Sequence, residues 1–145
     1  MIPILNSDAQ RITIGIDVGS TTTKTVVLNP EDESVLFSSY RRHHAKQASS
    51  VREILQEIKS TFPNADAEAI ITGSGGLPIS EALGLPFAQE VISSSLAIQR
   101  ICPEARTAIE LGGQDAKMIF FRTDLDSGAL NVADMEASYY LEGTK

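Results

Sequence analysis

Cysteine and tryptophan are nearly absent from this sequence: its 145 residues include one cysteine, Cys102, and no tryptophan. A single thiol can form neither an internal disulfide bond nor a cysteine-based metal site. Basic residues are also few, since 12 lysines and arginines stand against 19 aspartates and glutamates and give a net charge of −7. An acidic balance of this kind is not typical of a general nucleic-acid-binding protein.

Long hydrophobic runs are absent as well. No apolar stretch approaches the roughly 20 residues that a membrane-spanning helix needs. Residues 1–10 lack the pattern of a signal peptide and are interpreted as a loose leader. We therefore expect a cytoplasmic protein that binds neither membranes nor nucleic acid.

Apolar residues nevertheless make up 42% of the chain, which is enough for a folded core. Alternating apolar positions and β-branched runs predict strands at 12–16, 25–28, 35–37, 69–72, 107–111, 118–121 and 129–132. Apolar residues at helical spacing predict helices at 51–62, 78–84 and 90–101, with a capping box formed by Ser50 and Glu53 before the first. The first three strands predict an antiparallel meander, and the strand at 69–72 is expected to lie parallel to the first. This order predicts an α/β fold with a mixed sheet.

Two segments that start 93 residues apart have similar sequences. Residues 17–24 and 110–117 each run acid, apolar, glycine, small, polar, polar, small, lysine. Each copy follows one predicted strand and precedes another, which indicates a duplicated unit. Since no helix is predicted after the second copy, we expect a leader at 1–10, a first lobe at 11–105, the incomplete start of a second lobe at 106–135 and a tail at 136–145.

These two segments have the chemistry of a phosphate clamp. A hairpin tip rich in glycine and small hydroxyl residues lets backbone N–H groups reach phosphate oxygens, and a lysine adds positive charge. The residues expected to bind phosphate are Gly19, Ser20, Thr21, Thr22, Lys24, Gly112, Gly113 and Lys117. Asp17 is expected to hold Mg²⁺ through water, and Gln114 or Asp115 to orient the attacking water or the metal. Plain hairpin turns use the same residue types, whereas neither a Walker loop nor a Rossmann fingerprint occurs.

The paired segments resemble the phosphate hairpins of the actin-like ATPase superfamily, whose lobes are ribonuclease H-like. In detail, residues 16–24 and 110–117 are similar to the activators of 2-hydroxyacyl-CoA dehydratases and benzoyl-CoA reductases, the CoA-substrate-specific enzyme activases. Residues 40–44 and 72–91 are similar to the larger multidomain members of that family. The resemblance covers roughly residues 11–135 and is most specific at the Gly-Gly-Gln-Asp-x-Lys tip.

The resemblance implies a homodimer in which each subunit binds ATP and Mg²⁺, and in which ATP hydrolysis drives a low-potential electron into a partner dehydratase or reductase. Complete family members hold one [4Fe–4S] cluster between two subunits, through a cysteine that would follow residue 135. No cysteine occurs there, so we expect no cluster in this chain and no full ATP turnover by it alone. Two alternatives stay open: a sugar-type kinase of the same superfamily with Asp115 as the base, and a non-catalytic regulatory domain.

Other polar and glycine residues have a functional and a structural interpretation each. His43 and His44 are interpreted as part of a solvated loop rather than an anion patch, and Cys102 as a small core residue at a helix end. The glycines at 73–76 either approach the nucleotide or form a strand-to-helix turn. Glu90 is interpreted as a helix-start residue favoured by the helix dipole, with a position facing the cleft as the alternative.

Overall fold

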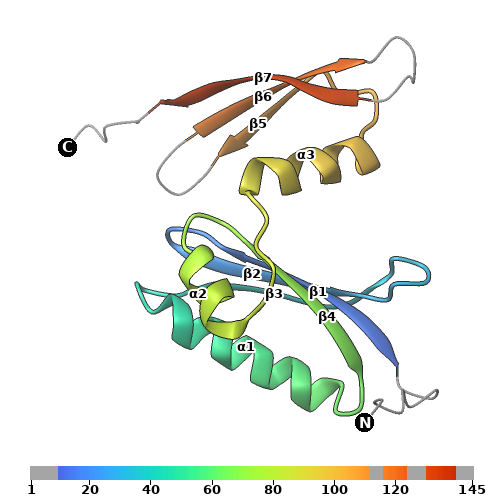
Figure 1. Ribbon diagram of the computed structural model, residues 1–145, viewed down its shortest axis with the longest axis vertical. Coiled ribbons are helices and arrows are strands. Elements are labelled where there is room, and N and C mark those ends of the chain that lie inside the picture. The colour runs from blue at the N-terminus through green and yellow to red at the C-terminus, as the bar shows by residue number, and fades with distance from the viewer. Residues whose placement is uncertain (1–9, 112–115, 124–129, 140–145) are drawn as a thin grey trace. The chain divides into compact units, whose positions relative to one another are not determined.

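The computed structural model describes residues 10–111, 116–123 and 130–139 (Figure 1). The chain divides into two compact units, residues 1–87 and residues 88–145. The elements, in chain order, are β1 (Arg11–Val18), β2 (Thr22–Leu28), β3 (Val35–Arg42), α1 (Gln47–Thr61), β4 (Asp66–Thr72), α2 (Leu77–Leu83), α3 (Glu90–Ile101), β5 (Thr107–Leu111), β6 (Ala116–Thr123) and β7 (Leu130–Tyr139). This is the predicted order of strands and helices. No helix in the described ranges is long and apolar enough to cross a membrane.

The first unit contains a four-stranded mixed sheet in the order β3-β2-β1-β4. β1, β2 and β3 form an antiparallel meander, and β4 pairs with β1 in parallel, as the sequence predicts. The parallel pairing follows from the crossover connection, because α1 carries the chain back to the same end of the sheet.

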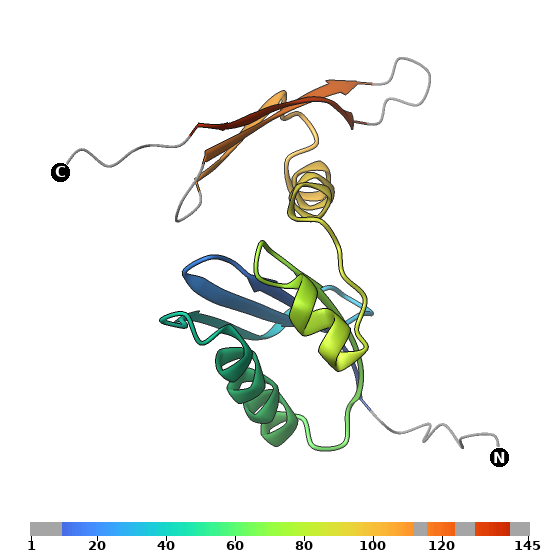
Figure 2. The same ribbon diagram turned by 60° about the vertical axis from the view of Figure 1, so that its left-hand side comes forward.

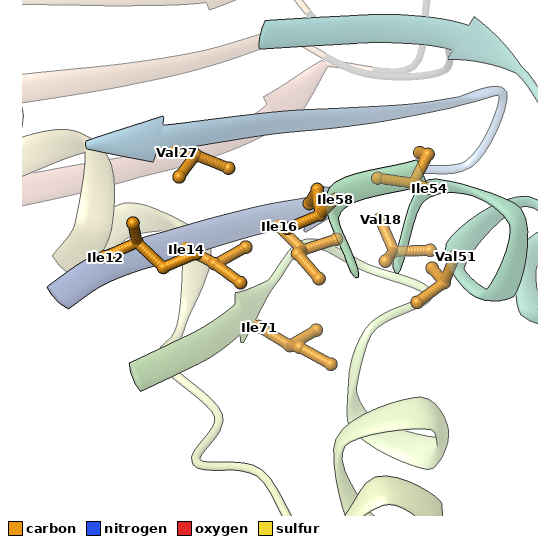
Figure 3. Close-up of a cluster of buried hydrophobic side chains, with 9 residues drawn as sticks. All are labelled: Ile12, Ile14, Ile16, Val18, Val27, Val51, Ile54, Ile58 and Ile71. Atoms are coloured by element: carbon orange, nitrogen blue, oxygen red, sulfur yellow. The ribbon is translucent and has the colours of Figure 1, made fainter. Parts of the chain in front are cut away.

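Alternate residues of β1 form the centre of the core of the first unit. Its even-numbered residues are buried while the intervening ones are half-buried, the pattern of a strand with one face on a core. On α1 the buried apolar residues recur at three- and four-residue spacing and face the same core. The buried side chains are Ile12, Ile14, Ile16, Val18, Val27, Val51, Ile54, Ile58 and Ile71 (Figure 3). Helix α1 therefore covers one face of the sheet, and Asp17 belongs to the opposite face.

The second unit contains α3 and an antiparallel sheet in the order β5-β6-β7. α3 lies along one face of this sheet (Figure 2). There Ile119 and Phe121 are buried and pack against Val91, Ile98 and Ala108. The described part of the unit thus has one covered sheet face.

The predicted repeat is confirmed by the pairing of the strands. Asp17 lies opposite Lys24 across β1 and β2, and Glu110 lies opposite Lys117 across β5 and β6. All five residue pairs between β5 and β6 correspond to pairs between β1 and β2 when the numbering is shifted by 93. The strands that flank residues 17–24 and 110–117 are therefore paired in the same register.

Several element boundaries differ from the predicted ones. α1 begins at Gln47 after the cap residue Lys46, so the predicted capping box is wrong: Ser50 is buried inside the helix and no side chain caps its start. β7 runs from Leu130 to Tyr139, beyond the end of the predicted strand at 129–132. The compact units divide after residue 87, and the lobe boundaries at 105 and 135 stay predictions. Strands extend past their apolar residues because backbone hydrogen bonds to neighbouring strands continue there.

Candidate functional site

The turn between β1 and β2 carries the first set of predicted phosphate-binding residues. The N–H of Gly19 donates to the carbonyl of Thr22 at 2.9 Å, so this amide serves the hairpin itself. In the part of the chain that the structure describes, the backbone N–H groups and hydroxyls of Ser20 and Thr21 donate to no other group. Thr22 is buried at the start of β2. The donors that this turn offers to an anion are therefore those of Ser20 and Thr21.

An ion pair lies directly beside this turn. Lys24 Nζ is 2.7 Å from Asp17 Oδ2, and the two residues face each other across the antiparallel strands. The other carboxylate oxygen, Asp17 Oδ1, is buried and has no hydrogen-bond partner among the described residues. The sequence predicts Lys24 as a mobile charge; its ammonium group in fact contacts the carboxylate that is predicted to hold the metal.

The glycine loop between β4 and α2 packs against the end of β1. The N–H of Gly75 donates to the carbonyl of Val18 at 2.8 Å. Gly73 has a φ of +94°, and a Cβ atom there would lie 2.4 Å from Asp17 Oδ1 and from the Val18 carbonyl oxygen. Glycine is thus required at this position by its backbone conformation and by its contact with Asp17.

His43 supports the same turn from the other side, which corrects its interpretation as a solvated residue. Its side chain is 4% exposed, and Nε2 lies 3.0 Å from the carbonyl oxygen of Gly19. The backbone N–H of His43 donates to the carbonyl of Thr21 at 3.3 Å. His44 is exposed, as the sequence predicts. The sequence around His43 and His44 does not show which of the two is buried. His43 is buried because it follows the end of β3 and lies next to the β1–β2 turn.

The second motif is described only in part. Gly112, Gly113, Gln114 and Asp115 lie outside the described residues. Lys117 Nζ is 2.6 Å from Glu90 Oε2 and 3.9 Å from Glu110 Oε1. The interpretation of Glu90 as a helix-start residue is confirmed, since it is the first residue of α3, but its contact with Lys117 was not predicted.

The described residues offer one carboxylate suited to a metal ion and no larger cluster. Mg²⁺ prefers hard oxygen ligands and keeps several waters, and Asp17 supplies a partly exposed carboxylate next to the donors of the turn. No group of three or more histidine, cysteine or acidic side chains in the described ranges is placed to hold a metal.

Cys102 caps the end of α3 and is exposed, so its interpretation as a core residue is wrong. A four-iron cluster needs four thiolates, and this chain contains a single cysteine.

An apolar groove between α1 and α2 is separate from this polar site. Its volume is about 460 Å³, and its lining includes Val51, Leu55 and Ile79. None of the predicted phosphate-binding residues lines it.

Residues 14–135 match the BadF/BadG/BcrA/BcrD ATPase family. The chain belongs to this family. It is 31% identical over 111 residues to the 2-hydroxyisocaproyl-CoA dehydratase activator of Clostridioides difficile, covering 74% of this chain and 40% of that protein. It is 30% identical over 109 residues to the (R)-2-hydroxyglutaryl-CoA dehydratase activating ATPase of Acidaminococcus fermentans, covering 74% and 41%. The chain thus spans about two fifths of the length of these relatives.

Solved structures support the same assignment. The present chain resembles the solved structure of the activator of the 2-hydroxyisocaproyl-CoA dehydratase from Clostridium difficile with bound ADPNP. The TM-score is 0.68 at 26% identity, and the match covers 86% of this chain and 44% of that one. A Ppx/GppA phosphatase from Aquifex aeolicus has a TM-score of 0.55 at 13% identity over 90% of this chain and 52% of its own, which shows a shared fold alone. The predicted α/β fold with a mixed sheet, of the actin-like ATPase type, is confirmed.

Proposed function

We propose that this chain contributes the phosphate-binding hairpins of an ATP-driven activator, and that the whole protein couples ATP hydrolysis to electron transfer into a 2-hydroxyacyl-CoA dehydratase or a related reductase. The family and the names of the relatives support this proposal. The proposal rests mainly on the β1–β2 turn, where the hydrogen-bond donors of Ser20 and Thr21 lie beside the Asp17–Lys24 ion pair. A site for nucleotide phosphates needs hydrogen-bond donors, a cation and a carboxylate that can hold a metal ion, and this turn brings the three together.

Each residue of the first hairpin has a distinct role in this proposal. The backbone and hydroxyl donors of Ser20 and Thr21 bind phosphate oxygens, and the ammonium group of Lys24 balances their charge. Asp17 would hold Mg²⁺ through water, and the ion would neutralise phosphate charge when bound. The contact between Asp17 and Lys24 keeps the carboxylate and the ammonium group on one side of the hairpin, next to the turn.

The second hairpin is proposed to bind the same nucleotide from the second lobe. Gly112, Gly113 and Lys117 would contact phosphate, and Gln114 or Asp115 would orient water or metal. The matched register of the two hairpins supports equivalent roles. We further propose a homodimer and a dehydratase or reductase component as partner. The electron-carrying cluster does not fit the residues of this chain, because its one cysteine is Cys102.

Titration calorimetry with ATP tests this function directly. The 145-residue chain is titrated with ATP to millimolar concentration, with Mg²⁺ and with EDTA. Asp17→Asn is expected to weaken Mg²⁺-dependent binding by about tenfold, because a carboxylate that orders metal-bound water is lost. The control is Asp32→Asn, a carboxylate that accepts hydrogen bonds from Ser34 in the β2–β3 turn and is expected to leave binding unchanged. Absence of binding by the wild-type chain would contradict the proposed function.

A further inference from the structure

A buried histidine fixes the peptide that precedes Ser20. The carbonyl oxygen of Gly19 can only accept a hydrogen bond, so the Nε2 atom of His43, 3.0 Å away, must carry the hydrogen. The imidazole is 4% exposed, and its Nδ1 atom is buried without a hydrogen-bond partner in the described part of the chain. Among the described residues, this ring therefore makes one hydrogen bond, the one to the turn.

This hydrogen bond determines where the Ser20 amide points. The carbonyl of Gly19 and the N–H of Ser20 belong to the same planar trans peptide and point in opposite directions. Since His43 holds the carbonyl toward the buried side of the turn, the Ser20 N–H must point away from it. Rotation of this peptide would instead turn a carbonyl oxygen toward a bound phosphate, where it would repel the anion.

The backbone of His43 holds the Thr21–Thr22 peptide in the same way. Its N–H donates to the carbonyl of Thr21, so side chain and main chain of one residue contact both ends of the turn. The following tight turn places His44 and Ala45 at positive φ, 48° and 62°, and is closed by a hydrogen bond from the Lys46 N–H to the His43 carbonyl. Such a backbone is unfavourable for residues other than glycine and persists only where surrounding contacts impose it.

We propose that His43 is a positioning residue for phosphate binding: by holding the Gly19 carbonyl, it keeps the Ser20 N–H directed at the ligand. This inference rests on the proposed function of the turn. It assigns to His43 a role that acts through the backbone of residues 19–21, without contact between the imidazole and the nucleotide.

The test compares two substitutions of His43 with a matched control. His43→Gln places an amide donor near the position of Nε2, whereas His43→Phe fills the space without a donor. His44→Gln changes the exposed neighbour and serves as the control. We expect His43→Phe to weaken MgATP binding by about tenfold, since a hydrogen bond that orders a ligand-binding amide is lost, and His43→Gln and His44→Gln to bind within about threefold of the wild type.

The imidazole ring itself provides a readout that needs neither a variant nor a nucleotide. Long-range ¹H–¹⁵N spectra of the wild-type chain are expected to show hydrogen on Nε2 of His43, and a ring protonated on Nδ1 alone would overturn the proposal. Equal MgATP affinity of wild type and His43→Phe would also overturn it. Absence of binding by the wild-type chain would instead overturn the proposed function, so the two failures are distinguishable.

Discussion

Ile16 and Ile109 occupy equivalent positions in the two copies of the hairpin, yet Ile16 is 1% exposed and Ile109 is 62% exposed. In the first unit this face of the sheet lies under α1. In the second unit α3 covers the other face, and the next residue on the Ile109 face, Leu111, is 80% exposed. The same apolar pattern is thus buried in one copy and open to solvent in the described part of the other. This difference supports the proposal that residues 106–135 are the incomplete start of a second lobe.

Truncation of these two isoleucines should therefore have unequal effects. Ile16→Ala is expected to lower the free energy of unfolding by about 3 kcal/mol, because it opens a cavity in a closed core. Ile109→Ala should change it by less than about 1 kcal/mol, because its side chain is already in water. Urea denaturation followed by circular dichroism gives both values. Equal destabilisation of the 145-residue chain by the two substitutions would show that the sheet face with Ile109 is not open to solvent.

The contact between Gly73 and Asp17 predicts a strong effect of one added methyl group. Gly73→Ala would place Cβ 2.4 Å from Asp17 Oδ1 in a backbone of φ +94°. We expect a loss of at least about 2 kcal/mol of folding stability from strain and overlap. Gly84→Ala is the control, since φ is +65° but no atom lies within 4 Å of its Cβ, and should cost only about 1 kcal/mol. Equal costs in thermal or urea unfolding would show that the contact with Asp17 is unimportant.

The unpredicted ion pair in the second unit can be measured with a double-mutant cycle. Glu90→Gln and Lys117→Met, alone and together, should give a coupling energy of about 1 kcal/mol, because both side chains are mostly shielded from water. The pair of Arg41 and Glu57, whose side chains are more exposed, is the matched comparison and should couple by about 0.5 kcal/mol or less. A coupling energy of zero for Glu90 and Lys117 would contradict their contact.

The strained turn after His43 predicts a substitution that increases stability. Ala45 has a φ of 62°, where glycine is favoured over alanine by about 1 kcal/mol. Ala45→Gly should therefore raise the free energy of unfolding by up to that amount, despite the greater freedom of glycine in the unfolded chain. A decrease in the urea midpoint would show that the backbone at this turn is not left-handed.

Much of the fold follows from local sequence patterns. Alternating residues such as Ile12 and Ile14 identify β1, and glycine and proline mark where elements stop, so the element order and the parallel pairing of β4 with β1 could be predicted. The start of α1 could not, because Ser50 is turned into the core by tertiary packing instead of capping a helix. Local propensity decides helix and strand, but packing decides which polar residue is buried.

The candidate site was predictable to a similar extent. The repeat identified the hairpin residues, whereas the opposed pair of Asp17 and Lys24, seven residues apart around the turn, was not predicted. The supporting contacts of His43 and Glu90 come from elements that are distant in sequence, 24 and 27 residues from the groups they touch. Such contacts leave no spacing signal in a single sequence, because they depend on how whole elements pack.

The proposed binding of nucleotide phosphate at the β1–β2 turn is tested most directly by ¹H–¹⁵N spectra of the 145-residue chain during titration with MgATP to millimolar concentration. We predict progressive shifts of the Ser20 and Thr21 amide signals, and no comparable shift for residues of α1 such as Leu55. Binding that leaves the Ser20 and Thr21 amide signals unchanged would contradict the proposed site, as would shifts confined to α1 and α2.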